Sequence, residues 1–425
     1  MMELAPPRGT QDLLAPRSEA MLGLYEESHR LAQLFGFRYV ETPTFEHTEL
    51  FTRTSGETSD VVTKEMYTFE DKGGRSVTLR PESTASVVRA YLSHAQELPN
   101  PFKAYYVGSE FRHARPQTGR LREFRQFGIE IIGVEGPGAD AEVITLGERF
   151  LRERGLRDVR LHLNSIGDEA CRPAYRERLV DHFEPYRDRL DADCQARLTK
   201  NPLRVFDCKV DGQRDFVLAA PTIIDHLCDA CAAHFAELRA RLDEAGIAYL
   251  VDPRLVRGLD YYTRSAFEWI SEALPSEQSA TVNAGGRYDG LAEALGGSPT
   301  PGVGFALGLD RVLLAIEAEG AESPGPRGPR CFVVAIGDDG RVAGRDLIGA
   351  LRDAGISATG SDEERPLKAQ LKMADRAGAA FVAIVGEREL ADGTVTLRRL
   401  VDGIQKVVPL ADVAGWLSRL DDWVA

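Results

Sequence analysis

The segment Lys103–Gly133 holds the polar side chains whose types and spacing best suit chemistry. It has the pattern of two strands joined by a polar loop, and alternate residues of a strand point to the same face. Glu110 and Arg112 therefore share a face of the first strand. Gln126 and Glu130 share a face of the second strand. We expect this face to present an arginine, an amide and two carboxylates, with glycines that leave room for a ligand. The alternative is an ordinary solvated sheet face.

Other glycine-rich segments also begin or end near an arginine. We predict that Arg257–Trp269 is a third strand, which begins with an arginine. Gly302–Leu307 has the pattern of a strand that leads into a helix with Arg311 in its first turn. Between them, Asn283–Leu291 has paired glycines that permit close approach of the backbone. A lone arginine is usually a surface residue, but three at the ends of glycine-rich strands suggest a shared role.

Several common catalytic patterns are absent from the sequence. There is no G-x-x-x-x-G-K-[ST] loop, so any nucleotide chemistry must proceed without one. The glycines of Gly302–Gly308 are spaced G-x-G-x-x-x-G and precede a helix that runs into a linker, which argues against a dinucleotide-binding fingerprint. Neither H-E-x-x-H nor G-x-S-x-G occurs, so no zinc protease or nucleophile elbow is indicated.

Four of the six cysteines lie in one charged region and raise the question of zinc binding. Cys228 and Cys231 have the C-x-x-C spacing of half a zinc site, whereas Cys194 and Cys208 are poorly spaced for the other half. Inert thiols are the alternative. The sequence leaves zinc binding undecided, and we name no metal ligand from it.

The composition of the 425 residues is that of a globular protein, with 43% hydrophobic and 28% charged residues. The net charge of −14 disfavours non-specific coating of nucleic acids or anionic membranes, although a local basic patch can still hold a nucleic acid. Apolar stretches are much shorter than the roughly twenty residues of a membrane span, and no secretory signal pattern is present. Sparse cysteines complete the expectation of a cytoplasmic protein with no membrane partner.

A proline- and glycine-rich linker, Glu319–Pro329, divides the chain. We expect a sheet domain over residues 1–325, with a charged helical insertion at about 170–245, and an α/β domain over 330–425. The predicted elements of the second domain are strand Cys331–Ile336, a helix that ends at Gly355, strand Ile356–Thr359, helix Pro366–Ala377, strand Ala380–Val385 and a hairpin formed by Val395–Leu400 and Gln405–Leu410.

The chain resembles a known enzyme family in several separate motifs. GFRYVETP at 36–43, FRHARPQTGR at 111–120 and GVGFALGLDR at 302–311 are similar to the three signature motifs of class II aminoacyl-tRNA synthetases. More narrowly, TLRPE at 78–82, RGLDYYTR at 257–264 and GGRYDGL at 285–291 resemble histidyl-tRNA synthetases. The resemblance covers nearly the whole chain. One departure is Ser83, where the family usually has glycine after the glutamate.

The resemblance implies an α+β fold and a histidine–tRNA ligase. The antiparallel sheet domain would be catalytic: it would activate L-histidine with ATP and Mg²⁺ and esterify it to the 3′ end of tRNA(His). The implied histidine-binding residues are Glu82, Ser83, Thr84, Gln126, Glu130, Tyr261 and Tyr262. Arg112 and Arg257 would be catalytic, clamping the α-phosphate of ATP, and Arg311 would meet the ATP tail and adenine.

The resemblance also implies how the tRNA and a second subunit are bound. Residues 330–425 would bind the anticodon, the insertion would contact the acceptor arm, and Gln117 would lie where the acceptor end is read. The motif that contains Pro43 normally lies at a twofold interface, so we expect a homodimer. The alternative is the synthetase-like regulatory subunit of the first enzyme of histidine biosynthesis, which generally lacks the C-terminal domain.

Overall fold

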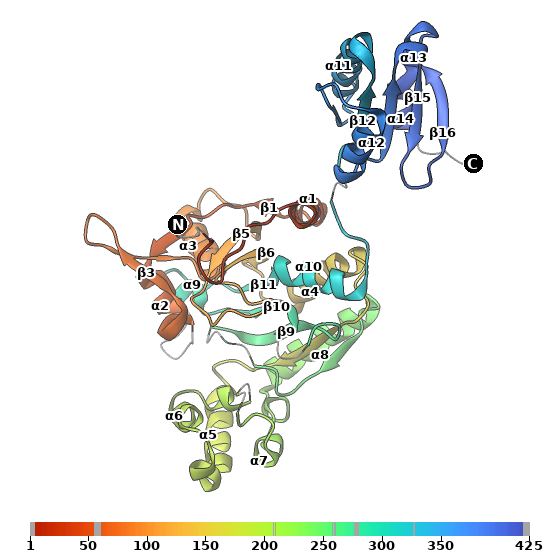
Figure 1. Cartoon of the computed structure of the whole chain (residues 1–425). Coiled ribbons are helices and arrows are strands. Elements are labelled where there is room, and N and C mark those ends of the chain that lie inside the picture. Colours follow the sequence, from red (N-terminus) through yellow and green to blue (C-terminus); the bar gives the residue numbers. More distant parts are fainter. Residues whose placement is uncertain are drawn as a thin grey trace. The chain divides into compact units, whose positions relative to one another are not determined.

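The computed structural model describes residues 5–54, 61–206, 208, 210–256, 258, 261–275, 280–325 and 328–419, with the backbone alone at residues 61, 63 and 200 (Figure 1). The chain divides into two compact units: the first contains the residues up to Leu14 and Ala20–Pro324, and the second contains Ala15–Glu19 and the residues from Gly325 onward. No helix of the described part is both long and apolar enough to cross a lipid bilayer.

A large sheet forms the centre of the first unit, with strand order β1-β5-β6-β11-β10-β9-β7-β8. Its strands are β1 (Arg38–Tyr39), β5 (Phe102–Phe111), β6 (Glu123–Ile132), β7 (Val159–Ser165), β8 (Tyr249–Val251), β9 (Thr263–Ser271), β10 (Thr281–Arg287) and β11 (Gly302–Gly308). The two edge pairs, β1 with β5 and β7 with β8, are parallel, and the pairs between them are antiparallel. The expected antiparallel sheet domain is confirmed.

Helices cover both faces of this sheet. The helices are α1 (Arg17–Leu34), α3 (Thr84–His94), α4 (Pro137–Glu153), α8 (Asp229–Glu244), α9 (Leu291–Ala294) and α10 (Leu309–Glu319). α1, α4, α8 and α10 share one apolar core with Tyr105, Phe127 and Ile129 of the sheet. α3 and α9 lie on the other face, against Tyr106 and Ile132. Tyr105 and Tyr106 therefore point to opposite faces, as strand alternation predicts.

A small sheet lies beside the large one, with strand order β2-β4-β3. Its elements are β2 (Phe45–His47), α2 (Thr48–Thr54), a π-helical turn (Val61–Glu65), β3 (Tyr67–Glu70) and β4 (Ser76–Leu79). The backbone N–H of Arg80, directly after β4, donates to the carbonyl oxygen of Thr44 at 3.0 Å. The small sheet thus delivers the chain to Glu82 and to the start of α3.

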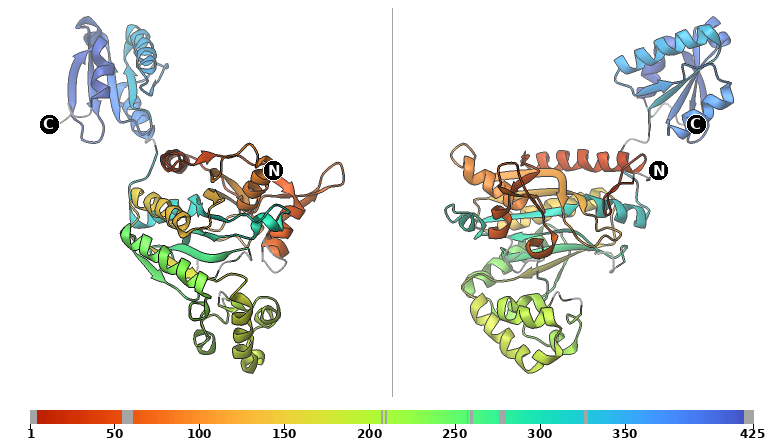
Figure 2. Two further views of the ribbon diagram at one scale, coloured as in Figure 1. Left: turned by 180° about the vertical axis from the view of Figure 1, so that it is seen from behind. Right: turned by 60° about the vertical axis from the view of Figure 1, so that its left-hand side comes forward.

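The insertion is helical, as its pattern predicts, and forms a lobe beside the sheet (Figure 2). It contains α5 (Arg172–Phe183), α6 (Ala192–Lys200), α7 (Asp215–Leu218) and 3-10 turns at Glu184–Arg189, Pro202–Val205 and Ile223–His226. These elements share a core of their own around Leu179, Phe183 and Val205. The next helix, α8, packs instead into the core of the large sheet through Phe235 and Leu238.

The second unit is an α/β domain whose five-stranded sheet has the order β13-β12-β14-β15-β16. Its elements are β12 (Cys331–Ala335), α11 (Gly337–Asp353), β13 (Ala358–Gly360), α12 (Leu367–Arg376), β14 (Phe381–Val385), α13 (Glu387–Ala391), β15 (Thr394–Arg399), β16 (Gln405–Pro409), a 3-10 turn (Leu410–Asp412) and α14 (Val413–Ser418). The β-α-β-α-β order and the hairpin are confirmed, whereas the short helices α13 and α14 were not predicted.

Candidate active site

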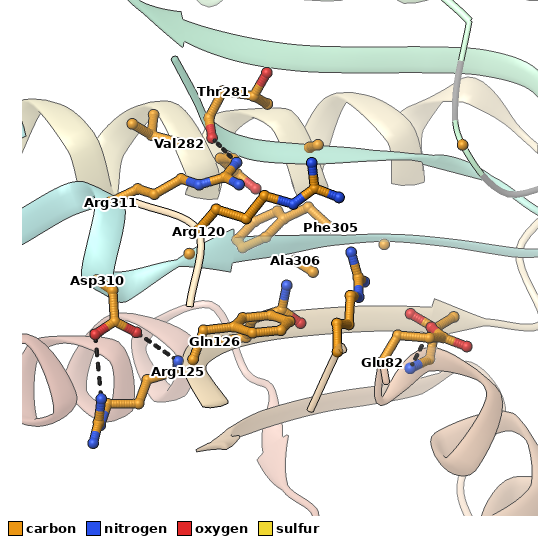
Figure 3. A pocket seen from close by; sticks show the side chains of 18 of the residues that line it. Glu82, Arg120, Arg125, Gln126, Thr281, Val282, Phe305, Ala306, Asp310 and Arg311 are labelled. Carbon is orange, nitrogen blue, oxygen red and sulfur yellow. Dashed lines mark hydrogen bonds and ion pairs between the residues drawn. The ribbon is translucent and has the colours of Figure 1, made fainter. Parts of the chain in front are cut away.

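A cavity of about 440 Å³ opens on the large sheet, on the face that α3 also covers. Its floor comes from β6, β10 and β11, and its walls come from the loop before β6 and from the N-termini of α3 and α10. Figure 3 shows Glu82 at one end and Arg120, Arg125 and Arg311 toward the other. The cavity therefore has an acidic end and a basic end.

Glu82 forms the acidic end together with the start of α3. Its side chain is 4% exposed and accepts hydrogen bonds from the backbone N–H groups of Thr84, at 3.1 Å, and Ala85, at 3.2 Å. The Tyr261 hydroxyl donates to the same carboxylate at 3.3 Å. Glu82 thus occupies the anion position at a helix N-terminus. Burial raises the pKa of this carboxyl, although the N–H of Ala85 and the charge of Arg112 oppose the rise.

Glu130 is the second carboxyl group of the acidic end and has no exposed surface. Thr84 Oγ1 donates to its Oε1 at 2.7 Å, and the Tyr288 hydroxyl donates to its Oε2 at 2.5 Å. Burial raises the pKa of Glu130 to about 8, against the opposing effect of these hydrogen bonds. This shift favours the uncharged form of Glu130 in the free protein.

The glycines of the sheet make room for protein side chains, which corrects the expectation that they make room for a ligand. A Cβ atom on Gly304 would lie 1.9 Å from Glu130 Oε2, and one on Gly128 would lie 2.1 Å from the Tyr106 ring. Strand pairing sets Gly304 directly opposite Glu130, so a side chain at 304 would displace the carboxylate. The Glu130 carboxylate packs against Gly304 and the Tyr106 ring packs against Gly128, so these glycines let side chains of the protein lie flat on the sheet.

Four arginines line the cavity: Arg112, which lies close to Glu82, and Arg120, Arg125 and Arg311 toward the basic end. Arg112 Nε donates to the Pro81 carbonyl oxygen at 2.8 Å, and the guanidinium lies over the Phe124 ring, 5.3 Å from its centroid. Arg311 donates to the carbonyl oxygens of Gly119 and Thr281, each at 2.8 Å.

The other two arginines, Arg120 and Arg125, pair with carboxylates. Arg125 Nη1 contacts Asp310 Oδ1 at 3.2 Å, and Arg120 Nη2 donates to Glu65 at 2.5 Å. These contacts fix the direction of each guanidinium. Such a fixed set of planar cations suits a polyphosphate.

Most of the predicted site residues line this one cavity. The predicted residues that line the cavity are Glu82, Thr84, Arg112, Gln126, Glu130, Tyr261, Tyr262 and Arg311. Gln126 is 9% exposed, and its Oε1 has no hydrogen-bond partner within the described part of the chain. This oxygen is therefore available to a ligand that donates a hydrogen bond.

Other predicted residues lie elsewhere. Ser83 is 1% exposed and donates to Glu110 at 2.5 Å, so it lies behind the cavity wall. Glu110, expected on the open sheet face, is itself fully buried there. Gln117 is exposed in the loop before β6, where its backbone pairs with that of Arg120. Arg257 lies outside the described residues, and the strand predicted to begin with it begins at Thr263 instead.

Sequence reasoning missed three residues that complete the site. Tyr288 hydrogen-bonds Glu130, and Asp310 and Glu65 hold arginines of the basic end. Tyr288 belongs to the GGRYDGL motif and Asp310 directly precedes Arg311, so both lay within segments already singled out. Glu65 lies far from these motifs in the sequence, which carries no signal for it.

Comparisons with known proteins agree across the whole chain. The family description "Histidyl-tRNA synthetase" matches residues 9–312, and "Anticodon binding domain" matches residues 330–420. The histidine–tRNA ligase of Moorella thermoacetica is 48% identical over 417 residues, which cover 98% of each chain. That of Geobacillus thermodenitrificans is 48% identical and covers 97% of each.

Solved structures agree as well. The apo histidyl-tRNA synthetase of S. aureus is 39% identical, with a TM-score of 0.79 over 98% of this chain and 100% of that one. A Bacillus halodurans protein described as an ATP phosphoribosyltransferase regulatory subunit/histidyl-tRNA synthetase shares the fold, at 22% identity and a TM-score of 0.62. The matched anticodon-binding domain argues against the regulatory-subunit alternative. The chain belongs to the histidyl-tRNA synthetase family, and its activity is that of a histidine–tRNA ligase.

Proposed function

We propose that the cavity binds histidine at its acidic end and ATP at its basic end, joins them as histidyl-adenylate, and then transfers the histidyl group to the 3′ end of tRNA(His). The observation that carries this proposal is the separation of charge within one cavity. Glu82 and Glu130 lie at one end with Arg112 close to Glu82, and Arg120, Arg125 and Arg311 lie toward the other end (Figure 3). An amino acid and a polyphosphate need opposite charges, and a reaction between them needs both in one space.

Histidine is recognised at both of its polar groups in this proposal. Glu82, Thr84 and Gln126 receive the substrate ammonium, which is supported by the acceptor oxygen of Gln126 that has no partner in the described part of the chain. Glu130 and Tyr262 bracket the imidazole nitrogens, with Tyr261 beside them. An analogue that lacks a ring nitrogen leaves a buried polar group unpaired. A penalty of this kind discriminates far better than the fit of an apolar pocket.

The chemical step is attack of the histidine carboxylate on the α-phosphate of ATP. Negative charge builds up between two anions, so catalysis consists mostly of positioning and charge stabilisation. Arg112 is the described residue proposed for this role, and Arg257 is proposed as its partner. Arg311 holds the ATP tail and adenine. No side-chain nucleophile is required.

Mg²⁺ is proposed to accompany ATP, and it neutralises phosphate charge when bound. Proteins hold Mg²⁺ through one or two carboxylates together with phosphate oxygens. The carboxylates of the basic end, Glu65 and Asp310, already contact Arg120 and Arg125. These residues fit an ion that takes most of its ligands from the nucleotide and from water.

The rest of the chain is proposed to bind tRNA(His) and a second subunit in the cytoplasm. The domain after Gly325 takes the anticodon, the insertion contacts the acceptor arm, and the exposed loop with Gln117 meets the acceptor end. The segment that contains Pro43 is proposed to lie at the interface of a homodimer. A monomer mass in light scattering at micromolar concentration would count against the dimer.

The test is ATP–pyrophosphate exchange measured with each of the twenty amino acids. We expect exchange only with histidine, and a fall of about 10²–10³-fold in kcat for Arg112→Ala, because a charge at the reacting phosphate is lost. Arg241→Ala is the matched control, since that arginine is exposed on α8 and pairs with Glu237. Exchange with another amino acid, or none with histidine, would overturn the proposal.

A further inference from the structure

Three cysteines and an aspartate form a compact cluster where the insertion leaves and rejoins the sheet domain. Asp168 follows β7, and Cys171 is the N-cap residue of α5. Cys228 is the N-cap residue of α8, and Cys231 lies in its first turn. One ligand atom from each of the four lies within 4.8 Å of the others. The cluster, called the neck cluster below, therefore joins the first and last residues of the insertion.

The spacing within the neck cluster suits a tetrahedral ion. Cys171 Sγ lies 3.9 Å from Cys231 Sγ and 3.6 Å from Asp168 Oδ1. Cys228 Sγ lies 3.8 Å from the same carboxylate oxygen. Zinc held tetrahedrally, at about 2.3 Å from each sulfur, sets two sulfurs about 3.8 Å apart and a sulfur and an oxygen slightly closer.

The chain folds closely around one of these thiols. Gly167 has a φ of +65°, and a Cβ atom there would lie 2.6 Å from Cys171 Sγ. The backbone N–H of Asp168 donates to that sulfur at 3.3 Å. Such donors stabilise a thiolate more than a thiol. Cys171 and Cys231 are 6% and 0% exposed, so solvent does not compete for these sulfurs.

The second carboxylate oxygen of Asp168, Oδ2, is held by Arg264. Arg264 Nε and Nη2 both lie 3.4 Å from Asp168 Oδ2, which leaves Oδ1 turned toward the sulfurs. Partners of this kind orient the ligands of metal sites. Arg264 has a φ of +52°, a rare conformation for a residue other than glycine, so the backbone is bent to bring the guanidinium there.

We propose that Asp168, Cys171, Cys228 and Cys231 bind a structural zinc ion that fastens the two ends of the insertion together. Thiolate ligands select zinc over magnesium or calcium. Four protein ligands complete a tetrahedron and leave no position for water, which distinguishes a structural site from a catalytic one. Three thiolates and a carboxylate around a divalent ion leave a net negative charge, which Arg264 partly balances.

The ion also steadies the neighbouring wall of the cavity. Arg172, next to Cys171, donates to the carbonyl oxygen of Tyr262 and, at 3.0 Å, to that of Ile166. The N–H of Arg264 donates to the Gly167 carbonyl oxygen at 2.8 Å. The neck cluster is thereby tied to the segment that carries Tyr262.

The insertion contains a second cluster of cysteines and aspartates, which can be compared with the neck cluster. Cys194 and Cys208 lie with Asp191 and Asp211, so the four cysteines considered from the sequence belong to two places. The carboxylates here already accept backbone N–H groups: Asp191 from Cys194, at 2.9 Å, and Asp211 from Asp191, at 2.8 Å. Asp211 also contacts Arg214 at 2.9 Å. Asp168 Oδ1 of the neck cluster also accepts a backbone N–H, from Ala170 at 3.1 Å, so the clusters differ mainly in thiol number, three against two. Zinc prefers the cluster with more thiolates.

The test measures zinc in the full-length protein, purified without chelators and dialysed against metal-free buffer. Elemental mass spectrometry should find a single zinc ion per chain. Cys228→Ser should lose it, because Cys228 is a proposed ligand; it is chosen because it is partly exposed, whereas Cys171 and Cys231 are buried. Cys194→Ser and Cys331→Ser should keep it, since these thiols lie in the second cluster and in the C-terminal domain. Cobalt(II) in place of zinc should give the charge-transfer absorption of tetrahedral thiolate.

Three results would overturn the proposal, and two of them do not depend on any variant. The first is a wild-type protein that stays free of zinc after addition of zinc under reducing conditions. The second is an intact mass lower by two hydrogens in the purified wild type, with peptide mapping that locates a disulfide within the neck cluster. The third is a zinc content unchanged by Cys228→Ser or lost equally in Cys331→Ser.

Discussion

Glu130 and Glu110 are two buried carboxyl groups with the same pKa but different positions. Burial raises the pKa of each to about 8, yet only Glu130 lines the cavity. A neutral Glu130 with a neutral imidazole carries the same number of protons as a carboxylate with an imidazolium. In the proposed complex, histidine would therefore bind Glu130 with one shared proton and no uptake from solvent, as long as the free carboxyl group is protonated and the free imidazole is not.

This proton count predicts a bell-shaped dependence of histidine affinity on pH. Below about pH 6.5, the reference value for imidazole, binding must release a proton. Above a pH of about 8, free Glu130 is ionised and binding must take up a proton. Affinity should therefore be highest between these values and fall on both sides. Titration calorimetry from pH 5.5 to about 9.5 measures the profile, at roughly tenfold per pH unit in each limb.

Glu130→Gln should move the upper limb to the higher pH at which the substrate ammonium loses its proton, and should weaken binding by about 1–3 kcal/mol, because a buried ring group loses its partner. Glu110→Gln is the matched control: its carboxyl group has a similar pKa but lies behind the wall, so the upper limb should stay. A flat profile for the wild type, or the same profile for both variants, would remove Glu130 from histidine recognition.

A buried group of three charged or polar side chains joins separate elements. Asp140 of α4 contacts Arg287 of β10, and His234 Nε2 of α8 lies 3.3 Å from the same carboxylate. Asp140 and Arg287 have no exposed surface. Burial alone would raise the pKa of Asp140, but His234 and Arg287 together lower it to about 2. The group therefore fixes two helices against the strand whose next residue is Tyr288.

Asp140→Ala should destabilise the catalytic unit, by about 3 kcal/mol, because it removes the fully buried partner of Arg287 and leaves that guanidinium with Asp289 as its carboxylate, at 3.1 Å. The melting temperature at pH 7 measures this. The stabilisation from Asp140 is present above the unfolded-state pKa, about 4, and is lost as pH falls toward 2, so the two proteins should converge in acid. Asp243→Ala, at an exposed site near the end of α8, should change stability by less than about 0.5 kcal/mol. Similar losses in both variants would contradict the assignment.

The sequence predicts elements well where local chemistry determines them. The strand Gly302–Gly308, the helix after it and the hairpin around Gly403, with its φ of +76°, follow from glycines and apolar runs. Strand β9 begins at Thr263, later than predicted, and it has a positive φ at Arg264 and a shift of register against β10 between Gly286 and Arg287. Neither feature has a local signature.

What lies behind a strand could not be predicted. Alternation placed Gln126 and Glu130 on one face, and both line the cavity. The same rule placed Glu110 on an open face, where Ser83 from a distant segment covers it. The pattern of α8 likewise shows an amphipathic helix, but not that it packs against α4 and the large sheet. Such contacts depend on which distant segments of the chain pack together, and the spacing of residues in the sequence does not show which segments do so.

Each of the two units of the chain has its own apolar core. The large sheet of the first unit is covered by four helices on one face, and the second unit encloses its core between Val333, Leu347 and Phe381. The described cavity residues all precede Pro324. Adenylate formation should therefore need only the first unit, whereas tRNA selection needs both.

Removal of residues 330–425 should spare histidine-dependent exchange and impair charging of tRNA. Both rates are measured on the same preparation of the truncated chain, and its melting temperature serves as the control for folding. Equal losses in the two assays would mean that the second unit supports the active site or the assembly of subunits.

The insertion leaves the sheet domain and returns to it at one place, since Cys171 and Cys231 are in contact. The helical lobe between these two cysteines can therefore be exchanged or shortened as one piece, called the cassette here. Replacing the helical lobe by a tight turn moves neither end, and each halving of the closed loop lowers the closure cost by about 0.6 kcal/mol. Helix α8, which belongs to the main core, stays in place. Arg204 of the lobe donates to the carbonyl oxygen of Gly258, a residue of the cavity, at 3.2 Å, so a shortened chain needs a replacement for this contact.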